Sequence, residues 1–301
     1  MKIERLLVAV DFSDTATAAA RYAAEHFVPG AEVVLLHVID PPARPRFARD
    51  MLPPEAALEA MAREFAAKRS MELASSLPNS VRSRIEIRVG KPHDVIASTA
   101  SDVDASIVVI GPHGDRPRPW RFLGTTADRV VRTSPVPVLV ATVPTPHPPR
   151  RILVPVDDDS STSPVLEWTR DLADRFDADV TLLHVWSNAI YSHVASMSYA
   201  ETRTEADARR EIESELRGAA EHWLKEMARG GLTRERVTST VAWGNAGDVV
   251  VETAQSSRAE LIVLGRNGSG LLSGALLGRT TATVLHGARC PVLVVTKSSG
   301  A

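Results

Sequence analysis

The glycines that follow two apolar segments of the chain have a spacing suited to phosphate binding. Residues 107–126 read IVVIGPHGDRPRPWRFLGTT, and residues 261–280 read LIVLGRNGSGLLSGALLGRT. Both have the pattern G-x2-G-x9-G, and the second copy lies 154 residues after the first. A ligand can approach the main-chain N–H groups of glycine closely, and successive N–H groups bind anions. The glycines are Gly111, Gly114 and Gly124 in the first segment and Gly265, Gly268 and Gly278 in the second.

An acidic residue and a helix start accompany each glycine pattern. Asp11 and Asp157 end the first apolar run of each half, and TTADRVV or RTTATVL follows the third glycine. A helix N-terminus attracts phosphate, and a carboxylate can accept hydrogen bonds from a ribose, so the combination indicates a nucleotide site. An alternative remains open, in which the glycines are turn residues and the aspartates compete with Ser13 and Ser160 as helix N-caps.

The whole chain is a duplication. The segment RLLVAVDFSDTA returns as RILVPVDDDSST, and AEVVLLHVID returns as ADVTLLHVWS. RVGKPHDVI and AWGNAGDVV repeat Asp94 and Asp248, which we interpret as surface or capping residues. A period near 150 residues is too long for a solenoid and fits two whole domains. We therefore predict domains at 1–143 and 151–301, joined by a proline-rich linker at 144–150.

Short apolar runs alternate with helical segments in each half. In the first half we expect strands near 4–11, 32–38, 84–89, 106–110 and 137–141. Their nearly continuous apolar character is typical of parallel strands buried on both faces. The fold class is therefore α/β, with two tandem doubly wound domains, each a five-stranded parallel sheet flanked by helices. If the first and fourth strands are neighbours, the acidic residue and the glycines share one crevice.

Composition and missing motifs argue against several classes of protein. No apolar run approaches the roughly 18 residues of a membrane helix, so we expect no membrane partner. The N-terminus lacks a cleavable signal, which favours a cytoplasmic protein. A net charge of −2 gives no reason to expect nucleic-acid binding. Cys290 is the only cysteine, which excludes an intrachain disulfide and a cysteine metal cluster; we expect it to be buried. No P-loop, nucleophile elbow or HExxH motif is present.

Both halves resemble universal stress protein domains, and the chain is similar to a tandem universal stress protein of the ATP-binding type. The signature of that family is G-x2-G-x9-G-[ST], ahead of a helix and a final strand like CPVLVV. The resemblance implies Rossmann-like domains of the adenine nucleotide alpha hydrolase-like type. It also implies ATP as the ligand, with Asp11 and Asp157 at the nucleoside end. The main chain of Val38 and of Val185 would meet the adenine. Phosphates would lie against Gly111, Gly114, Gly124 and Thr125 in the first half, and against Gly265, Gly268, Gly278, Arg279 and Thr280 in the second.

The second half departs from this signature, because Arg279 stands where the family has serine or threonine. A guanidinium can pair with phosphate, or it can fill the site itself. We interpret Asp158 and Asp159 as solvated loop residues and assign no metal ligand; binding of Mg²⁺ beside a phosphate is the alternative.

The resemblance implies a nucleotide-dependent stress-response regulator without fast turnover. The alternatives are a slow ATPase or phosphotransferase, and a sensor of AMP or a cyclic dinucleotide. The family resemblance further implies that the fifth strands, 137–141 and 291–296, pair within the chain, and that two chains form a homodimer.

Overall fold

The computed structural model describes residues 3–27, 30–41, 53–114, 123–142, 146–157, 162–186, 205–231, 236–266 and 276–296. Contacts divide the chain into two compact units, Lys2–His147 and Pro148–Lys297. Each unit contains five of the described strands, and each is a layer of parallel strands with helices on both faces.

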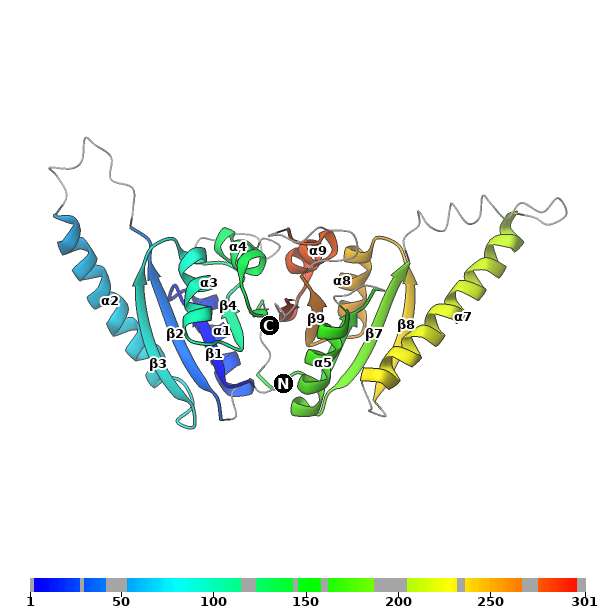
Figure 1. Cartoon of the computed structure of the whole chain (residues 1–301), viewed down its shortest axis with the longest axis horizontal. Coiled ribbons are helices and arrows are strands. Elements are labelled where there is room, and N and C mark those ends of the chain that lie inside the picture. Colours follow the sequence, from blue (N-terminus) through cyan, green and yellow to red (C-terminus); the bar gives the residue numbers. More distant parts are fainter. Residues whose placement is uncertain are drawn as a thin grey trace, which may run out of the picture. The chain divides into compact units, whose positions relative to one another are not determined.

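The first unit alternates strands and helices from end to end (Figure 1). Its strands are hydrogen-bonded in the order β3-β2-β1-β4-β5, and all four pairings are parallel. This confirms the predicted five-stranded parallel sheet. The elements are β1 (Arg5–Ala9), α1 (Asp14–His26), β2 (Glu32–Ile39), α2 (Glu55–Ser75), β3 (Arg82–Val89), α3 (Pro92–Asp102), β4 (Ile107–Ile110), α4 (Thr125–Thr133) and β5 (Val138–Val140).

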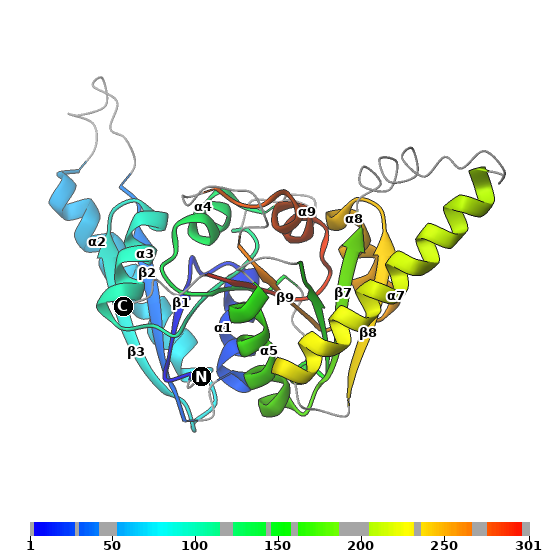
Figure 2. The ribbon, with the colours of Figure 1, turned by 45° about the vertical axis from the view of Figure 1, so that its right-hand side comes forward.

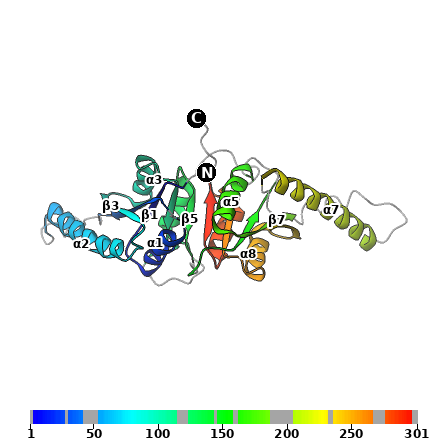
Figure 3. The same ribbon diagram turned by 90° about the horizontal axis from the view of Figure 1, so that it is seen from below.

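Helices cover both faces of the strands in the first unit. The chain runs outward from β1 to β3 and then returns to β4, on the other side of β1. Right-handed crossovers therefore place α1 and α2 on one face and α3 and α4 on the other. Figure 3 shows α1 and α2 on one side of the strands and α3 on the opposite side. The reversal between β1 and β4 is the point where open α/β sheets bind ligands.

The second unit repeats this architecture, with strand order β8-β7-β6-β9-β10 and parallel pairing throughout. In Figure 2, α7 runs along the strands β7 and β8. The predicted fold class is thus confirmed for both halves. The elements are β6 (Arg151–Pro155), α5 (Thr162–Phe176), β7 (Asp179–Trp186), α7 (Glu205–Gly231), β8 (Val237–Trp243), α8 (Ala246–Ser256), β9 (Leu261–Gly265), α9 (Arg279–Gly287) and β10 (Val292–Val295).

The central strands carry the core of each unit. Leu6, Leu7 and Val8 of β1 are fully buried, and so are the first three residues of β4. Helices cover these strands on both faces, which is why the sequence shows continuous apolar runs rather than alternation. Each fully buried Leu, Val or Ile side chain stabilises the fold by about 1.5–3 kcal/mol relative to exposure. None of the described helices is long and apolar enough to cross a bilayer.

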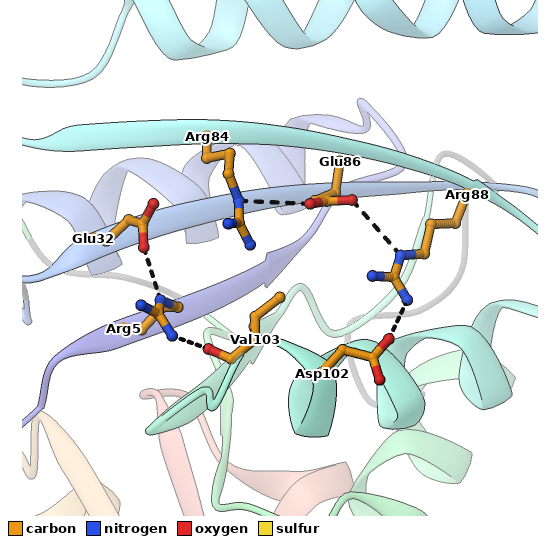
Figure 4. A network of polar contacts seen from close by, with 7 residues as sticks. All are labelled: Arg5, Glu32, Arg84, Glu86, Arg88, Asp102 and Val103. Carbon is orange, nitrogen blue, oxygen red and sulfur yellow. Dashed lines mark hydrogen bonds and ion pairs between the residues drawn. The ribbon is translucent and has the colours of Figure 1, made fainter.

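Ion pairs tie α3 to the outer strands of the first unit (Figure 4). Arg88 Nη1 lies 2.6 Å from Asp102 Oδ2 at the end of α3, and Arg88 Nε lies 3.7 Å from Glu86 Oε2. Arg5 Nε donates to Glu32 Oε2 at 2.7 Å, and another Arg5 nitrogen donates to the Val103 carbonyl. Such exposed pairs contribute little each, about 0–1 kcal/mol. Together they join α3 to β1, β2 and β3.

A buried carboxylate anchors the start of the second unit. Glu260 accepts a hydrogen bond from the Arg150 N–H at 2.7 Å and another from the Arg151 guanidinium. At the equivalent place in the first unit, Ser106 Oγ accepts from the Glu4 N–H at 3.0 Å. The backbone N–H that precedes the first strand therefore donates to a hydroxyl oxygen in the first unit and to a carboxylate in the second. Cys290, also buried, lies near this carboxylate.

We expect Cys290 to be inert in the folded protein. Burial, reinforced by the Glu260 carboxylate, raises the pKa of its thiol to about 12. At pH 8 almost no thiolate is present, and the thiolate is the reactive form. A chromogenic disulfide reagent should therefore react with it only after unfolding in guanidinium chloride. Complete labelling of the native protein within minutes, with an unchanged circular dichroism spectrum, would contradict this burial.

Candidate functional site

A cleft of about 390 Å³ opens at the carboxyl ends of β1 and β4 in the first unit. The strands are neighbours, with Ala9 paired to Ile110, so the expected switch point is present. All six residues predicted for the first half line this one cleft: Asp11, Val38, Gly111, Gly114, Gly124 and Thr125. The volume lies in the range of small-molecule sites. The structure thus brings together residues that are up to 114 positions apart in the chain.

The turn after β1 fixes the carboxylate of Asp11. Its Oδ1 accepts hydrogen bonds from the Ser13 N–H at 3.1 Å and from Ser13 Oγ at 2.5 Å. Ser13 is the N-cap of α1, and its Oγ accepts from the Ala16 N–H at 3.2 Å. The N-cap of α1 is therefore Ser13, and the alternative in which Asp11 is the cap is wrong for this half. One carboxylate oxygen is occupied by the turn, and the other, Oδ2, faces Gly114.

Phe12 lies within this turn and has an unusual backbone conformation. Its φ of 65° is in the left-handed region, which is uncommon for a residue with a side chain. The ring of Phe12 stacks on His37 with centroids 4.5 Å apart, and His37 Nδ1 donates to the Val10 carbonyl at 2.8 Å. Leu36 and Val38 line the cleft, and His37, between them on β2, points to the other face of the sheet. His37 thus has a structural role in holding this turn.

Close packing explains the glycines of the first loop. A Cβ on Gly111 would lie 3.1 Å from the backbone nitrogen of Ala16, at the start of α1. A Cβ on Gly114 would overlap Asp11 Oδ2, and one on Gly124 would lie 3.3 Å from the Pro112 carbonyl oxygen. The turn-and-packing interpretation therefore holds for these residues. It does not exclude the ligand interpretation, because the same three glycines line the cleft.

The N-terminus of α4 points an uncapped first turn at this cleft. Gly124 is its N-cap and offers no side-chain acceptor to the first N–H groups of the helix. Thr125, Thr126 and Ala127, which form the first turn, all line the cleft. Unpaired N–H groups and the helix dipole favour an anion at such a position. This geometry suits the phosphate group of a ligand.

Sequence reasoning missed part of the cleft wall. Pro92 and Ile96, from the first turns of α3, contribute apolar surface. Both residues belong to the segment RVGKPHDVI, and the repetition of this segment in the second half is the sequence feature that could have identified them. Asp94, from the same segment, has a side chain 66% exposed beside His93, in agreement with the surface interpretation. His113 also lines the cleft, and its carbonyl accepts a hydrogen bond from Thr15 Oγ1 at 2.5 Å.

The second unit repeats the backbone of this site. Gly278 is the N-cap of α9, and its N–H donates to the Arg266 carbonyl at 3.0 Å, as the Gly124 N–H does to Pro112 at 2.7 Å. Asp157 follows β6, and its carbonyl accepts from the Thr162 hydroxyl. Val185 lies on β7, and Gly265 ends β9. Gly268 lies outside the described residues, as do Asp158, Asp159 and Ser160.

Side chains at the second helix start differ from those in the first. Arg279 is the first residue of α9 and is exposed; it takes the place of Thr125, and Thr280 follows it. Thr281 is buried and donates to the Gly265 carbonyl at 2.8 Å, where the first unit has Ala127. Burial lowers the pKa of Arg266 in the second loop. No group of three metal-binding side chains occurs among the described residues.

Replacing Gly111 with alanine should destabilise the first unit by roughly 1–3 kcal/mol, the usual cost of overpacking. The Cβ would press on the backbone of Thr15 and Ala16, which cannot rotate away as a side chain does. Urea unfolding of Gly111→Ala measures this. Gly218→Ala is the matched control, because nothing lies within 4 Å of its Cβ and it is in a helix. The control should gain about 0.5–1 kcal/mol. Equal unfolding midpoints for both variants would disprove the packing argument.

Comparisons with known proteins connect both halves to one family. The model of the universal stress protein family matches residues 2–142 and 149–296. Universal stress protein Rv2623 of Mycobacterium tuberculosis is 28% identical over 231 residues, which cover 72% of this chain and 73% of that protein. Universal stress protein MJ0577 of Methanocaldococcus jannaschii is 30% identical over 151 residues, which cover 46% of this chain and 93% of that protein.

Solved structures agree on the fold. The crystal structure of a universal stress protein from Archaeoglobus fulgidus matches with a TM-score of 0.71 and 18% identity, covering 99% of this chain and all of that one. The resemblance of both halves to universal stress protein domains is therefore confirmed. The chain consists of two tandem universal stress protein domains and belongs to the universal stress protein family.

Proposed function

We propose that the cleft of the first unit binds ATP, and that the chain acts in the cytoplasm as a nucleotide-dependent regulator of a stress response, without fast turnover. The observation that carries this proposal is the convergence of Asp11, the glycine loop and the uncapped start of α4 on one cleft. A carboxylate at one side and free helix N–H groups at another match the ribose and the phosphates of a nucleotide. Membership of the universal stress protein family supports the regulatory role.

Each part of the ligand has a suitable partner. The phosphates would accept hydrogen bonds from the first-turn N–H groups of α4 and from the hydroxyl of Thr125. The ribose would donate to Asp11 Oδ2, since Oδ1 is already bonded to Ser13. The adenine would meet the main chain of Val38 and the apolar wall of Pro92 and Ile96. This arrangement supplies binding and orientation, and we assign no residue as a general base.

A second ATP site in the second unit is part of the proposal. Gly265, Gly278 and Thr280 have the positions of the first loop, and Asp157 has the position of Asp11. Arg279 would pair with phosphate through its guanidinium, adding positive charge that Thr125 lacks. The homodimer implied by the resemblance, with the fifth strands paired within the chain, remains a prediction.

Asp11→Asn should weaken ATP binding about 10- to 100-fold, because an amide N–H₂ would replace the acceptor that faces the ribose. The amide oxygen can still accept from Ser13, so the turn should survive. Isothermal titration calorimetry with ATP, AMP and a cyclic dinucleotide of adenosine measures both affinity and preference. Tighter binding of AMP or of the cyclic dinucleotide than of ATP would favour the alternative sensor function.

Asp94→Asn is the matched control for that experiment. It removes the same charge from the same unit, at a carboxylate that is largely exposed and does not line the cleft. We expect its affinity to equal that of the unmodified protein. If Asp11→Asn and Asp94→Asn bind equally tightly, the assignment of Asp11 to the nucleotide is wrong.

ATP incubated with the purified protein and Mg²⁺ should be recovered intact, since the proposal includes no group positioned to activate water. Chromatography of the nucleotides after several hours tests this against a sample without protein. Phosphate release well above that background, and its loss in Asp157→Asn, would instead indicate the ATPase or phosphotransferase alternative.

A further inference from the structure

Helix α2 exposes three large apolar side chains. Met61, Phe65 and Met71 are 64%, 60% and 61% exposed. They account for three of the four large apolar residues that are exposed in the described part of the chain. The helix meets the sheet through other residues, namely Ala66, Ser70 and Leu73, which are buried. Figure 1 shows α2 along the outer strands of the first unit. An exposed apolar patch of this kind commonly marks an interaction surface.

The duplicated helix provides an internal comparison. The positions 154 residues later on α7 hold Glu215, Ala219 and Lys225 in place of the three apolar residues. The offset of 154 residues also relates Gly90 to Gly244, the positive-φ glycines after β3 and β8. It pairs the buried Ala66 with the buried Ala220 on the two helices. The same helix in the same fold can thus have a polar outer face. Phe65 has a partner within the unit, because its ring meets that of Phe12 edge-on with centroids 6.2 Å apart. Met61 and Met71 lie instead on the side of the helix opposite the buried Ala66, where packing within the unit does not require apolar residues.

The charges of this face are self-complementary. Glu64 lies two residues before Ala66 and Lys68 two residues after it, and both are exposed. Met61 and Met71 lie five residues before and after the same point. At about 100° per residue, these four side chains lie within about 40° of the line opposite the buried Ala66. The other two basic residues of α2 are engaged, as Arg63 pairs with Glu59 and Arg69 with Glu72.

We propose that this face binds the α2 face of a second copy of the chain, with the two helices antiparallel about a two-fold axis near Ala66. A two-fold interface requires each residue to meet a partner at the mirrored position. Here Met61 of one copy would lie opposite Met71 of the other, and Glu64 opposite Lys68, each contact occurring twice. Four glutamates against two arginines and one lysine make α2 a poor match for an acidic membrane surface. One helix pair buries less than a standard interface, so the association is weak and depends on concentration.

Charge reversal tests the proposed register. Sedimentation equilibrium of the unmodified full chain should show a mass that doubles with rising concentration. Glu64→Lys and Lys68→Glu should each raise the dissociation constant of this step about tenfold, because each places like charges opposite one another twice. The double variant Glu64→Lys with Lys68→Glu restores opposite charges, and should associate as the unmodified chain does. Met61→Glu should abolish the step.

Lys225→Glu is the matched control, since it reverses a charge at the α7 position equivalent to Met71. Its association should be unchanged. All the altered residues are exposed, so circular dichroism and unfolding midpoints should agree across the variants. If none of the α2 variants changes the mass, a second copy is not the occupant. If the double variant associates no better than either single one, the antiparallel register is wrong.

Discussion

The close approach of the β4–α4 loop to the start of α1 is the contact on which the candidate site depends. At Gly111 the loop leaves no room for a side chain, because a Cβ would lie 3.1 Å from the Ala16 backbone nitrogen. Thr15 Oγ1 donates to the His113 carbonyl. Gly114 leaves room for the Asp11 carboxylate. Because of these contacts, an acidic residue from β1 and a helix start from α4 face a common cleft. Glycine is needed here chiefly because two backbone segments meet, and the cleft follows from that meeting.

The duplication separates what the fold requires from what each unit has added. Equivalent backbone bonds recur, including those from Gly124 to Pro112 and from Gly278 to Arg266. Side chains around that shared backbone have diverged. Thr281 bonds to the second loop where the first unit has Ala127. On the helices over the outer strands, a buried Ser70 corresponds to a buried Leu224. The units thus share one binding architecture and differ in surface and charge.

Much of the fold could be predicted from the sequence, because buried parallel strands give continuous apolar runs that helices interrupt. The glycines and Asp11 of the cleft could also be predicted, since their spacing repeats in both halves, whereas Val38 and Thr125 were implied by the family resemblance. The contribution of Pro92 and Ile96 could not, because it depends on how α3 packs across the sheet. The left-handed backbone conformation of Phe12 could not be predicted either, because nothing in the neighbouring residues requires a positive φ. The exposed face of α2 has no periodic signal, since small and apolar residues occur all around the helix.

The nucleotide content of the purified protein tests the central claim most directly. The protein would be denatured, and the released small molecules identified and counted by chromatography and mass spectrometry. The account predicts about two ATP per chain when both units bind, and about one when only the cleft of the first unit does. Release of no nucleotide, together with no binding when ATP is added back to the folded protein, would contradict it. The glycines would then serve only the packing of the loop against α1.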